Sequence, residues 1–75
     1  MSIQRLLLAD DSLTARESQV LKGIVQGKMN KVLADELSLS IKTIEMYRAR
    51  LRKKYNVKTI AELIVVVITS SQESR

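Results

Sequence analysis

The 75-residue chain contains no cysteine, no histidine, no proline, no tryptophan and no phenylalanine. Without cysteine there are no disulfide bonds, and without cysteine or histidine the common zinc sites are excluded. Without histidine the chain also lacks the usual general base near neutral pH. What is left is an aliphatic composition with two glycines and two tyrosines, which favours helices. A chain of this length allows one small domain with an economical core.

Long hydrophobic runs are also missing. The run LIVVVI at residues 63–68 is far shorter than the ~20 residues that cross a bilayer. The N-terminal stretch MSIQRLLLADD has an apolar run too short for a signal-peptide core, and acids follow it directly. We therefore expect no membrane association and a cytoplasmic location.

The charge is distributed unevenly along the chain. The net charge is +5, yet seven basic residues against one acid, Glu45, leave six excess positive charges between residues 42 and 58. The seven are Lys42, Arg48, Arg50, Arg52, Lys53, Lys54 and Lys58. Such a concentration suggests a polyanionic partner. The alternative is a solvated helix face.

Two helices are predicted in the first half of the chain. Thr14 and Glu17 have the spacing of a capping box, in which each side chain binds the other residue's backbone amide. Apolar residues then recur at helical spacing until Gly27, which suits the left-handed end of a helix. We expect a first helix over about 14–26 and a second, short helix over about 30–37.

A longer helix is predicted over about 41–55, after a tight connection at 38–40 with Ser40 as its N-cap. Asn56 tolerates the left-handed turn that would end it. One face is an apolar stripe of Ile44, Tyr47, Leu51 and Tyr55. The opposite face carries Lys42, Glu45, Met46, Ala49, Arg50 and Lys53.

The fourth segment gives conflicting signals. The run VVVIT has strand propensity, but Thr59 and Glu62 have the spacing of a second capping box, and no second strand is available for pairing. We therefore expect a helix from Thr59. Its buried stripe is predicted to be Ile60, Leu63, Ile64 and Val67. The segment is apolar on more than one face, so Val65, Val66 or Ile68 would be exposed on a monomer.

These elements predict an all-α fold, a compact four-helix helix-turn-helix domain. We expect residues 1–12 to be a linker that could form an additional helix, residues 13–69 to be the domain with its motif at about 30–49, and residues 70–75 to be a disordered tail. The stretch RLLLADD could instead begin a phosphate-accepting receiver domain. That hypothesis lacks the chain length and a later acceptor, because the only later aspartate, Asp35, lies on a predicted helix.

A short helix, a three-residue turn and a longer basic helix follow one another in the order of a helix-turn-helix motif. The major groove of DNA is ~12 Å wide and accepts one α-helix. The inserted helix needs one face fixed on a core, one face free of large apolar side chains, and cations near the phosphates. The helix predicted over 41–55 meets all three requirements, so double-stranded DNA is the expected partner.

Several short motifs follow one another along about fifty residues, with the spacing of a known family and without a gap. They are LTARE at 13–17, VL at 20–21, Gly27 with Asn30 and Lys31, Ala34 and Leu37, SIKTIE at 40–45, RKKY at 52–55 and AELI at 61–64. Together they resemble the LuxR/FixJ/NarL-type DNA-binding domain, with FixJ-like response-regulator output domains the nearest in character. The chain departs from that pattern at Tyr47, where the family usually has histidine, at Met29, where a capping residue is common, and at Tyr55–Asn56, where Leu-Gly is common.

The resemblance implies sequence-specific DNA binding in transcription regulation by the output domain of a two-component response regulator, which is not an enzyme. The implied base readers are Glu45, Met46 and Ala49. The implied contacts to phosphates or bases are Asn30, Lys31, Lys42, Thr43, Arg48, Arg50 and Lys53. For Glu45 the alternative is an ion pair with Arg48 one helical turn away. Lys54 and Lys58 are expected to be solvated charges.

In this family the fourth helix is a dimer surface, which implies that Ile60, Leu63, Ile64 and Val67 contact a second copy. We expect a weak homodimer that reads two half-sites related by a two-fold axis, about one helical turn apart. The alternative is a C-terminal helix with a surplus of apolar residues. No cofactor, metal ion or small-molecule ligand is expected. The rival function is a helix-turn-helix interaction module whose basic face binds an acidic protein and not DNA.

Overall fold

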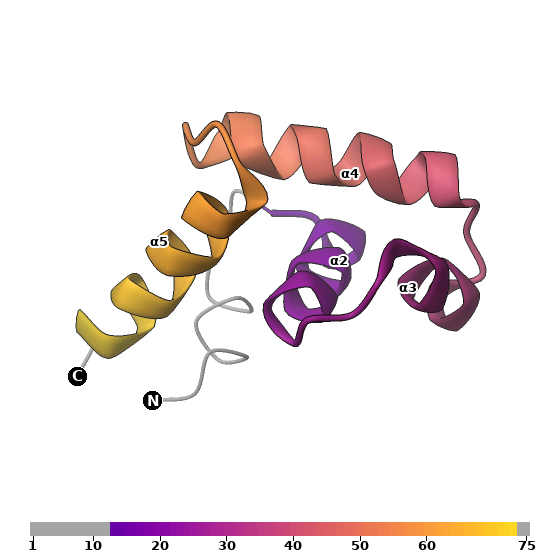
Figure 1. The fold of residues 1–75 in the computed structure, drawn as a ribbon, viewed down its shortest axis with the longest axis horizontal. Helices are drawn as coiled ribbons and strands as arrows, with labels where there is room; N and C mark the ends of the chain where they lie inside the picture. Colours follow the sequence, from indigo (N-terminus) through magenta and orange to yellow (C-terminus); the bar gives the residue numbers. More distant parts are fainter. Residues whose placement is uncertain (1–12, 74–75) are drawn as a thin grey trace.

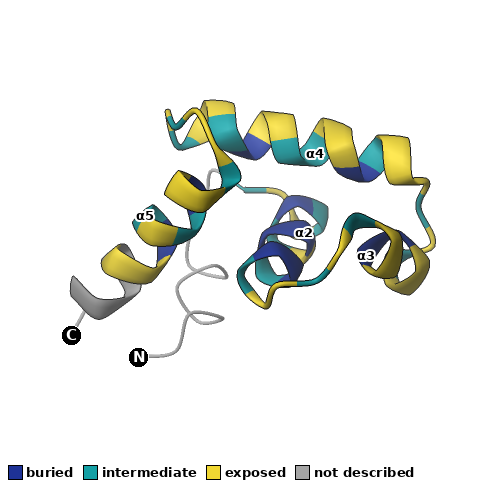
Figure 2. Cartoon of the chain, in the orientation of Figure 1, coloured by how far each residue is buried: buried dark blue, intermediate teal, exposed yellow. Residues whose placement is uncertain are grey.

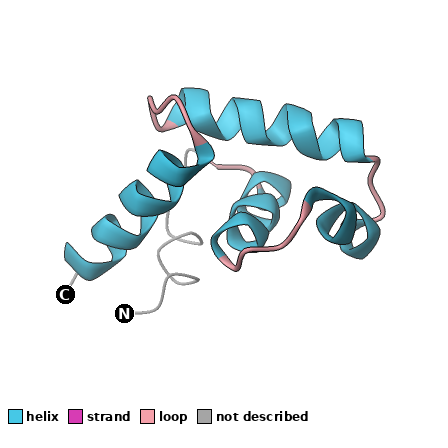
Figure 3. Cartoon of the chain, in the orientation of Figure 1, coloured by secondary structure: helices cyan, strands magenta, loops and turns pink. Residues whose placement is uncertain are grey.

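The computed structural model describes residues 13–73, and within that range the chain is all helix and loop, with no strand (Figures 1 and 3). The helices are α2 (Ala15–Val25), α3 (Asn30–Leu37), α4 (Ile41–Lys54) and α5 (Ile60–Glu73). The predicted all-α, four-helix arrangement is therefore confirmed for the described residues. The linker expected at 1–12 lies outside them.

The capping box predicted at the start of α2 is present. The Thr14 hydroxyl accepts a hydrogen bond from the Glu17 amide at 3.1 Å, and the Glu17 carboxylate accepts one from the Thr14 amide at 2.9 Å. These two bonds satisfy amides that a helix N-terminus leaves without intrahelical partners. Ser40 caps α4 in a similar way and accepts from the Thr43 amide at 3.0 Å.

Helices α2, α3 and α4 end with the same backbone conformation. Gly27, Ser38 and Asn56 have positive φ angles of 81°, 56° and 56°. In each case the amide of the following residue bonds to a carbonyl five residues before it: Lys28 to Gly23, Leu39 to Ala34 and Val57 to Arg52, at 3.0, 2.9 and 2.9 Å. This closure satisfies the last carbonyls and turns the chain sharply. The predicted turns at Gly27 and Asn56 are confirmed, whereas the left-handed serine was not anticipated.

The segment with conflicting signals is helical. The Thr59 hydroxyl accepts from the Glu62 amide at 3.1 Å, as a cap does, although the Glu62 carboxylate meets the threonine hydroxyl at 3.4 Å and not its amide. Helix α5 continues to Glu73, into the 70–75 segment for which a disordered tail was expected. The helix extends one turn past its last apolar residues.

Helix α4 is the centre of the fold. It packs against α2, α3 and α5, which lie along one of its sides (Figure 1). Its buried residues lie on the side of the helix that faces these helices, and its outer side is exposed over most of its length (Figure 2). Among the described residues the core has nine members: Val20, Leu21, Ile24, Leu33, Ala34, Ile44, Leu51, Leu63 and Val67. All are aliphatic, as the composition predicted, and none is more than 4% exposed.

None of the described helices is both long and apolar enough to cross a membrane.

Candidate nucleic-acid interface

The outer face of α4 is the one that the sequence predicted. Six residues on it are exposed: Lys42, Glu45, Met46, Ala49, Arg50 and Lys53. On the inner face Ile44 and Leu51 are fully buried, so the helix is fixed by its apolar stripe. The exposed face has one large apolar side chain near its centre, Met46, which is 44% exposed. The small residue Ala49 leaves the backbone open to close approach.

Glu45 is an acid in a basic surrounding, and it makes no ion pair in the part of the chain that the structure describes. The two ion pairs found there join Lys28 to Glu36 and Lys54 to Glu17. The alternative in which Glu45 is held by Arg48 is therefore not observed. An unpaired carboxylate on the outer face remains able to accept hydrogen bonds from a partner.

The first turn of α4 is held by side-chain hydroxyls. Thr43 is half-buried, and its hydroxyl lies 2.8 Å from that of Ser40. Thr43, expected as a DNA contact, thus also braces the N-cap. Further along the helix Arg48 and Arg52 are half-buried at the edges of the outer face. Such partial burial is typical of a long basic side chain whose stem packs while its charge stays near the surface.

Tyr47 occupies the half-buried slot where the family pattern usually has histidine. The Arg50 guanidinium lies over its ring, 5.8 Å from the ring centre. A cation at this distance is attracted by the ring face. The aromatic ring therefore restrains a charged side chain of the outer face.

The other expected anchors are at the start of α3. Asn30 is half-buried and Lys31 is exposed in the first turn of this helix. Met29 precedes them in extended conformation and gives no side-chain cap, as the sequence predicted. The first amides of α3 are thus left for water or for a ligand. Both residues lie where a helix dipole favours an anion.

Lys54 was expected to be a solvated charge, and that prediction is wrong. Its ammonium group donates to the Glu17 carboxylate at 2.8 Å. Glu17 is 3% exposed and is the one buried charged residue among those described. The Lys54 ammonium, helped by the Thr14 amide, holds the pKa of the Glu17 carboxyl below its ordinary value, although burial acts in the opposite direction.

The residues expected to form a dimer surface divide into two groups. Leu63 and Val67 are 0% and 1% exposed and belong to the core, so they are not available to a second copy. Ile60 and Ile64 are half-buried against that core. The prediction of Leu63 and Val67 as contacts is therefore wrong, because they fill the monomer's interior. The exposed large apolar residues of α5 are Val65 and Ile68, at 61% and 37%.

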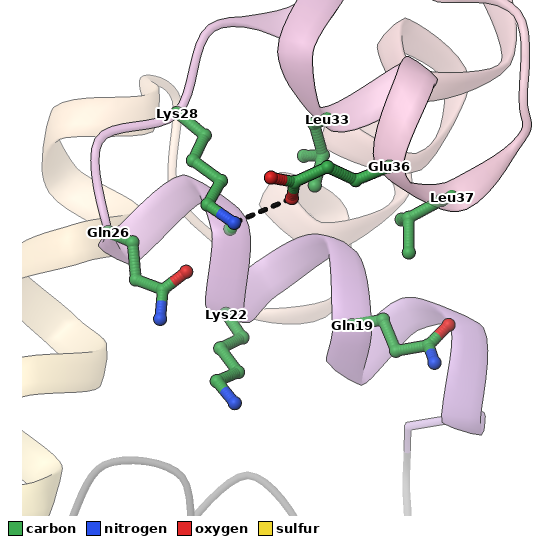
Figure 4. A pocket seen from close by; sticks show the side chains of 8 residues that line it. Gln19, Lys22, Gln26, Lys28, Leu33, Glu36 and Leu37 are labelled. Carbon is green, nitrogen blue, oxygen red and sulfur yellow. Dashed lines mark hydrogen bonds and ion pairs between the residues drawn. The ribbon is translucent and has the colours of Figure 1, made fainter.

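Among the residues that the structure describes, two hollows lie away from the outer face of α4. One is shallow and lies on α5, lined by Ala61, Glu62, Val65 and Val66. The other is a groove between α2 and α3 across which Lys28 and Glu36 meet at 2.6 Å (Figure 4). Gln19, Lys22, Gly23, Gln26, Leu33 and Leu37 complete the lining of that groove. Sequence reasoning did not find it, because its residues come from two helices and share no motif.

A short helix, a tight turn and a basic helix with one fixed and one open face define the class of protein: a helix-turn-helix DNA-binding domain. The family model for bacterial regulatory proteins of the luxR family matches residues 11–67. The chain belongs to the luxR family.

The curated relatives are longer proteins. The chain is 46% identical over 56 residues to YgeK of Escherichia coli K12, an uncharacterized response regulatory protein, and the match covers 75% of this chain and 38% of YgeK. It is 42% identical over 53 residues to the transcriptional regulatory protein FixJ of Bradyrhizobium diazoefficiens, covering 71% and 26%. The response regulator protein TmoT of Ectopseudomonas mendocina is 39% identical over 64 residues, covering 85% and 29%. No solved structure matches the chain significantly. The chain thus spans well under half of the length of these relatives.

Proposed function

We propose that this chain is the output domain of a two-component response regulator and that it inserts α4 into the major groove of double-stranded DNA. The observation that carries the proposal is the outer face of α4. Its six exposed residues include three cations and one small residue, while the opposite side is locked into the core. The names of the relatives support the response-regulator origin, since YgeK and TmoT are both described as response regulators.

Within that face we assign two kinds of contact. Glu45, Met46 and Ala49 lie along the exposed side of the first turns and are proposed to read base edges. A carboxylate can accept from cytosine N4, and a methionine can contact a thymine methyl group. The proposed phosphate or base contacts are Asn30, Lys31, Lys42, Thr43, Arg48, Arg50 and Lys53. Five of them are on α4 and two are at the start of α3.

We further propose that two copies associate weakly on DNA through the exposed side of α5 and read two half-sites. Val65 and Ile68 are apolar, exposed and one helical turn apart. The shallow hollow beside Val65 would receive a side chain of the second copy. In the proposed pair the two α4 helices would enter the duplex on the same side, about one helical turn apart.

Selection of binding sites from random duplexes, followed by anisotropy titrations at several salt concentrations, tests the DNA proposal. We expect an enriched sequence with two-fold symmetry and an affinity that falls steeply with salt, because each neutralised phosphate releases a counterion. Lys53→Ala should reduce the salt dependence. Lys22→Ala on the α2–α3 groove is the matched control and should not.

The rival is a helix-turn-helix module that binds an acidic protein. If micromolar protein gives no mobility shift of duplex DNA at low salt, the DNA proposal fails and the rival takes its place. A shift without any enriched sequence would refute the base-reading roles while leaving general DNA binding in place.

A further inference from the structure

The first turn of α2 contacts the ends of both helices of the helix-turn-helix. Arg16 donates from its guanidinium to the carbonyl of Leu37, the last residue of α3, at 3.4 Å. Glu17 accepts from the ammonium of Lys54, the last residue of α4, at 2.8 Å. Two adjacent residues of one helix thus hold the C-terminal ends of two others.

The carboxylate of Glu17 lies deeper than a helix cap requires. A cap can remain in water, whereas Glu17 is 3% exposed and one of its oxygens bonds to both Thr14 and Lys54. Burying a charge is unfavourable unless it is paired and hydrogen-bonded. The buried position therefore indicates a task that a surface cap does not perform, namely reaching the last turn of α4.

The contact at Lys54, at the C-terminal end of α4, also determines where the N-terminal end of the same helix lies. From Lys54 to Lys42 the helix is roughly 18 Å long, at ~1.5 Å per residue. A tilt of ~5° about the Lys54 end would displace the Lys42 end by roughly 1.5 Å, which is larger than the ~0.5 Å within which a recognition site must be held. The hydrogen bond from Arg16 to Leu37 fixes α3, which carries Asn30 and Lys31, relative to α2.

We propose that Arg16 and Glu17 are positioning residues for DNA recognition, which set α3 and α4 at the angle that lets base readers and phosphate anchors meet the same duplex. This inference rests on the proposed function. Neither residue lies on the outer face of α4, so they act through Leu37 and Lys54. Lys54 in turn serves the fold's geometry rather than the phosphate backbone.

The test compares Glu17→Gln and Lys54→Gln with the wild-type chain on the selected duplex and on a random duplex. We expect each variant to bind the selected duplex about tenfold more weakly, a loss of the size of one mismatched base pair. Binding to the random duplex should change less than about twofold, because the phosphate contacts tolerate small tilts. The double variant should be no worse than Lys54→Gln alone, since adding Glu17→Gln removes a link that is already lost.

Two controls separate positioning from other roles. Glu36→Gln breaks the exposed pair with Lys28 and should leave the ratio of the two affinities unchanged. If Lys54 instead bound a phosphate, Lys54→Gln would lower the slope of log affinity against log salt by about one, whereas a positioning role leaves it unchanged. Circular dichroism melts show that each titration is made on folded protein.

An unchanged ratio of selected to random affinity in folded Glu17→Gln would overturn the inference and leave only a role in stability. If Glu17→Gln does not fold, Lys54→Gln decides alone, because it removes the link from the exposed side. Failure of the proposed function looks different: the wild-type chain itself would then select no sequence. Selective wild-type binding with unaffected variants would overturn the positioning role only.

Discussion

Gly23 and Leu33 bring α2 and α3 closer together than a larger residue at position 23 would allow. A Cβ atom at Gly23 would lie 2.5 Å from Cδ1 of Leu33. Leu33 is 2% exposed and is held by the core, so its side chain cannot simply swing away. The absence of one side chain on α2 therefore sets the position of the helix that leads into the turn.

Gly23→Ala should lower the free energy of unfolding by about 1 kcal/mol, because ~1–3 kcal/mol of overpacking exceeds the ~1 kcal/mol gain in helix propensity. Urea denaturation measures the change. The double variant with Gly23→Ala and Leu33→Ala should lose less free energy of unfolding than the two single variants lose together. The reason is that the new methyl group enters the space left by the leucine. Gly27→Ala is the control: nothing lies within 4 Å, but φ is +81°, so its cost should be additive with Leu33→Ala. Strict additivity of Gly23→Ala with Leu33→Ala would contradict the close approach.

Stability should fall on acidification through Glu17. The pKa of its carboxyl is below the ordinary value of 4.5 because Lys54 and Thr14 donate to the charged form. The resulting stabilisation is complete above pH 4.5 and is lost as the pH falls from there through the lowered pKa. Urea midpoints between pH 7 and pH 3 should drop less steeply for Glu17→Gln than for the wild type. Glu36→Gln, at an exposed ion pair, should follow the wild-type curve. Identical curves for all three proteins would exclude Glu17 as the source of the stability lost on acidification.

Replacing Glu45 by alanine and replacing Lys53 by alanine should change DNA binding in different ways. Glu45→Ala should reduce discrimination at one position of the selected site by ~1–3 kcal/mol, because a base-edge contact is lost. Lys53→Ala should weaken all duplexes alike and lower the salt slope by about one. Anisotropy titrations on a set of single-base variants distinguish the two patterns. An equal loss on every sequence for Glu45→Ala would argue against its reading role.

The exposed side of α5 should matter for pairs of half-sites and not for folding. Val65→Gln removes an exposed apolar contact and should reduce cooperative binding to a two-half-site duplex about tenfold, a typical coupling between sites. Its affinity for a single half-site should not change. Leu63→Ala, on the buried side, should instead cost ~2–5 kcal/mol of stability. Retained cooperativity in Val65→Gln would place the contact between copies elsewhere.

Local signals predicted most of the fold. The capping box at Thr14, the glycine at 27 and the apolar stripe of α4 each depend on residues within a few positions of one another, and all three are found in the structure. The exposed face of α4 followed from the same stripe, because one face of a helix is open once the opposite face is packed. The DNA-contacting roles on that face stay predictions.

Relations between distant residues could not be predicted. Glu17 and Lys54 are 37 positions apart, and in the sequence Lys54 is one of several lysines in a basic run. In α5 every position from Leu63 to Ile68 is apolar, so the sequence indicated a buried stripe but not that the same stripe is unavailable to a second copy. The left-handed turn at Ser38 has no sequence signal either, since serine is not a usual residue there.

Both tyrosines are associated with α4: Tyr47 lies within this helix and Tyr55 is its C-cap residue. With no tryptophan and no phenylalanine in the chain, they are its only aromatic side chains. Near-ultraviolet absorption, fluorescence and aromatic proton resonances of the whole protein therefore arise from this one helix. A change in tyrosine emission on adding DNA would report on α4 directly, without an attached dye.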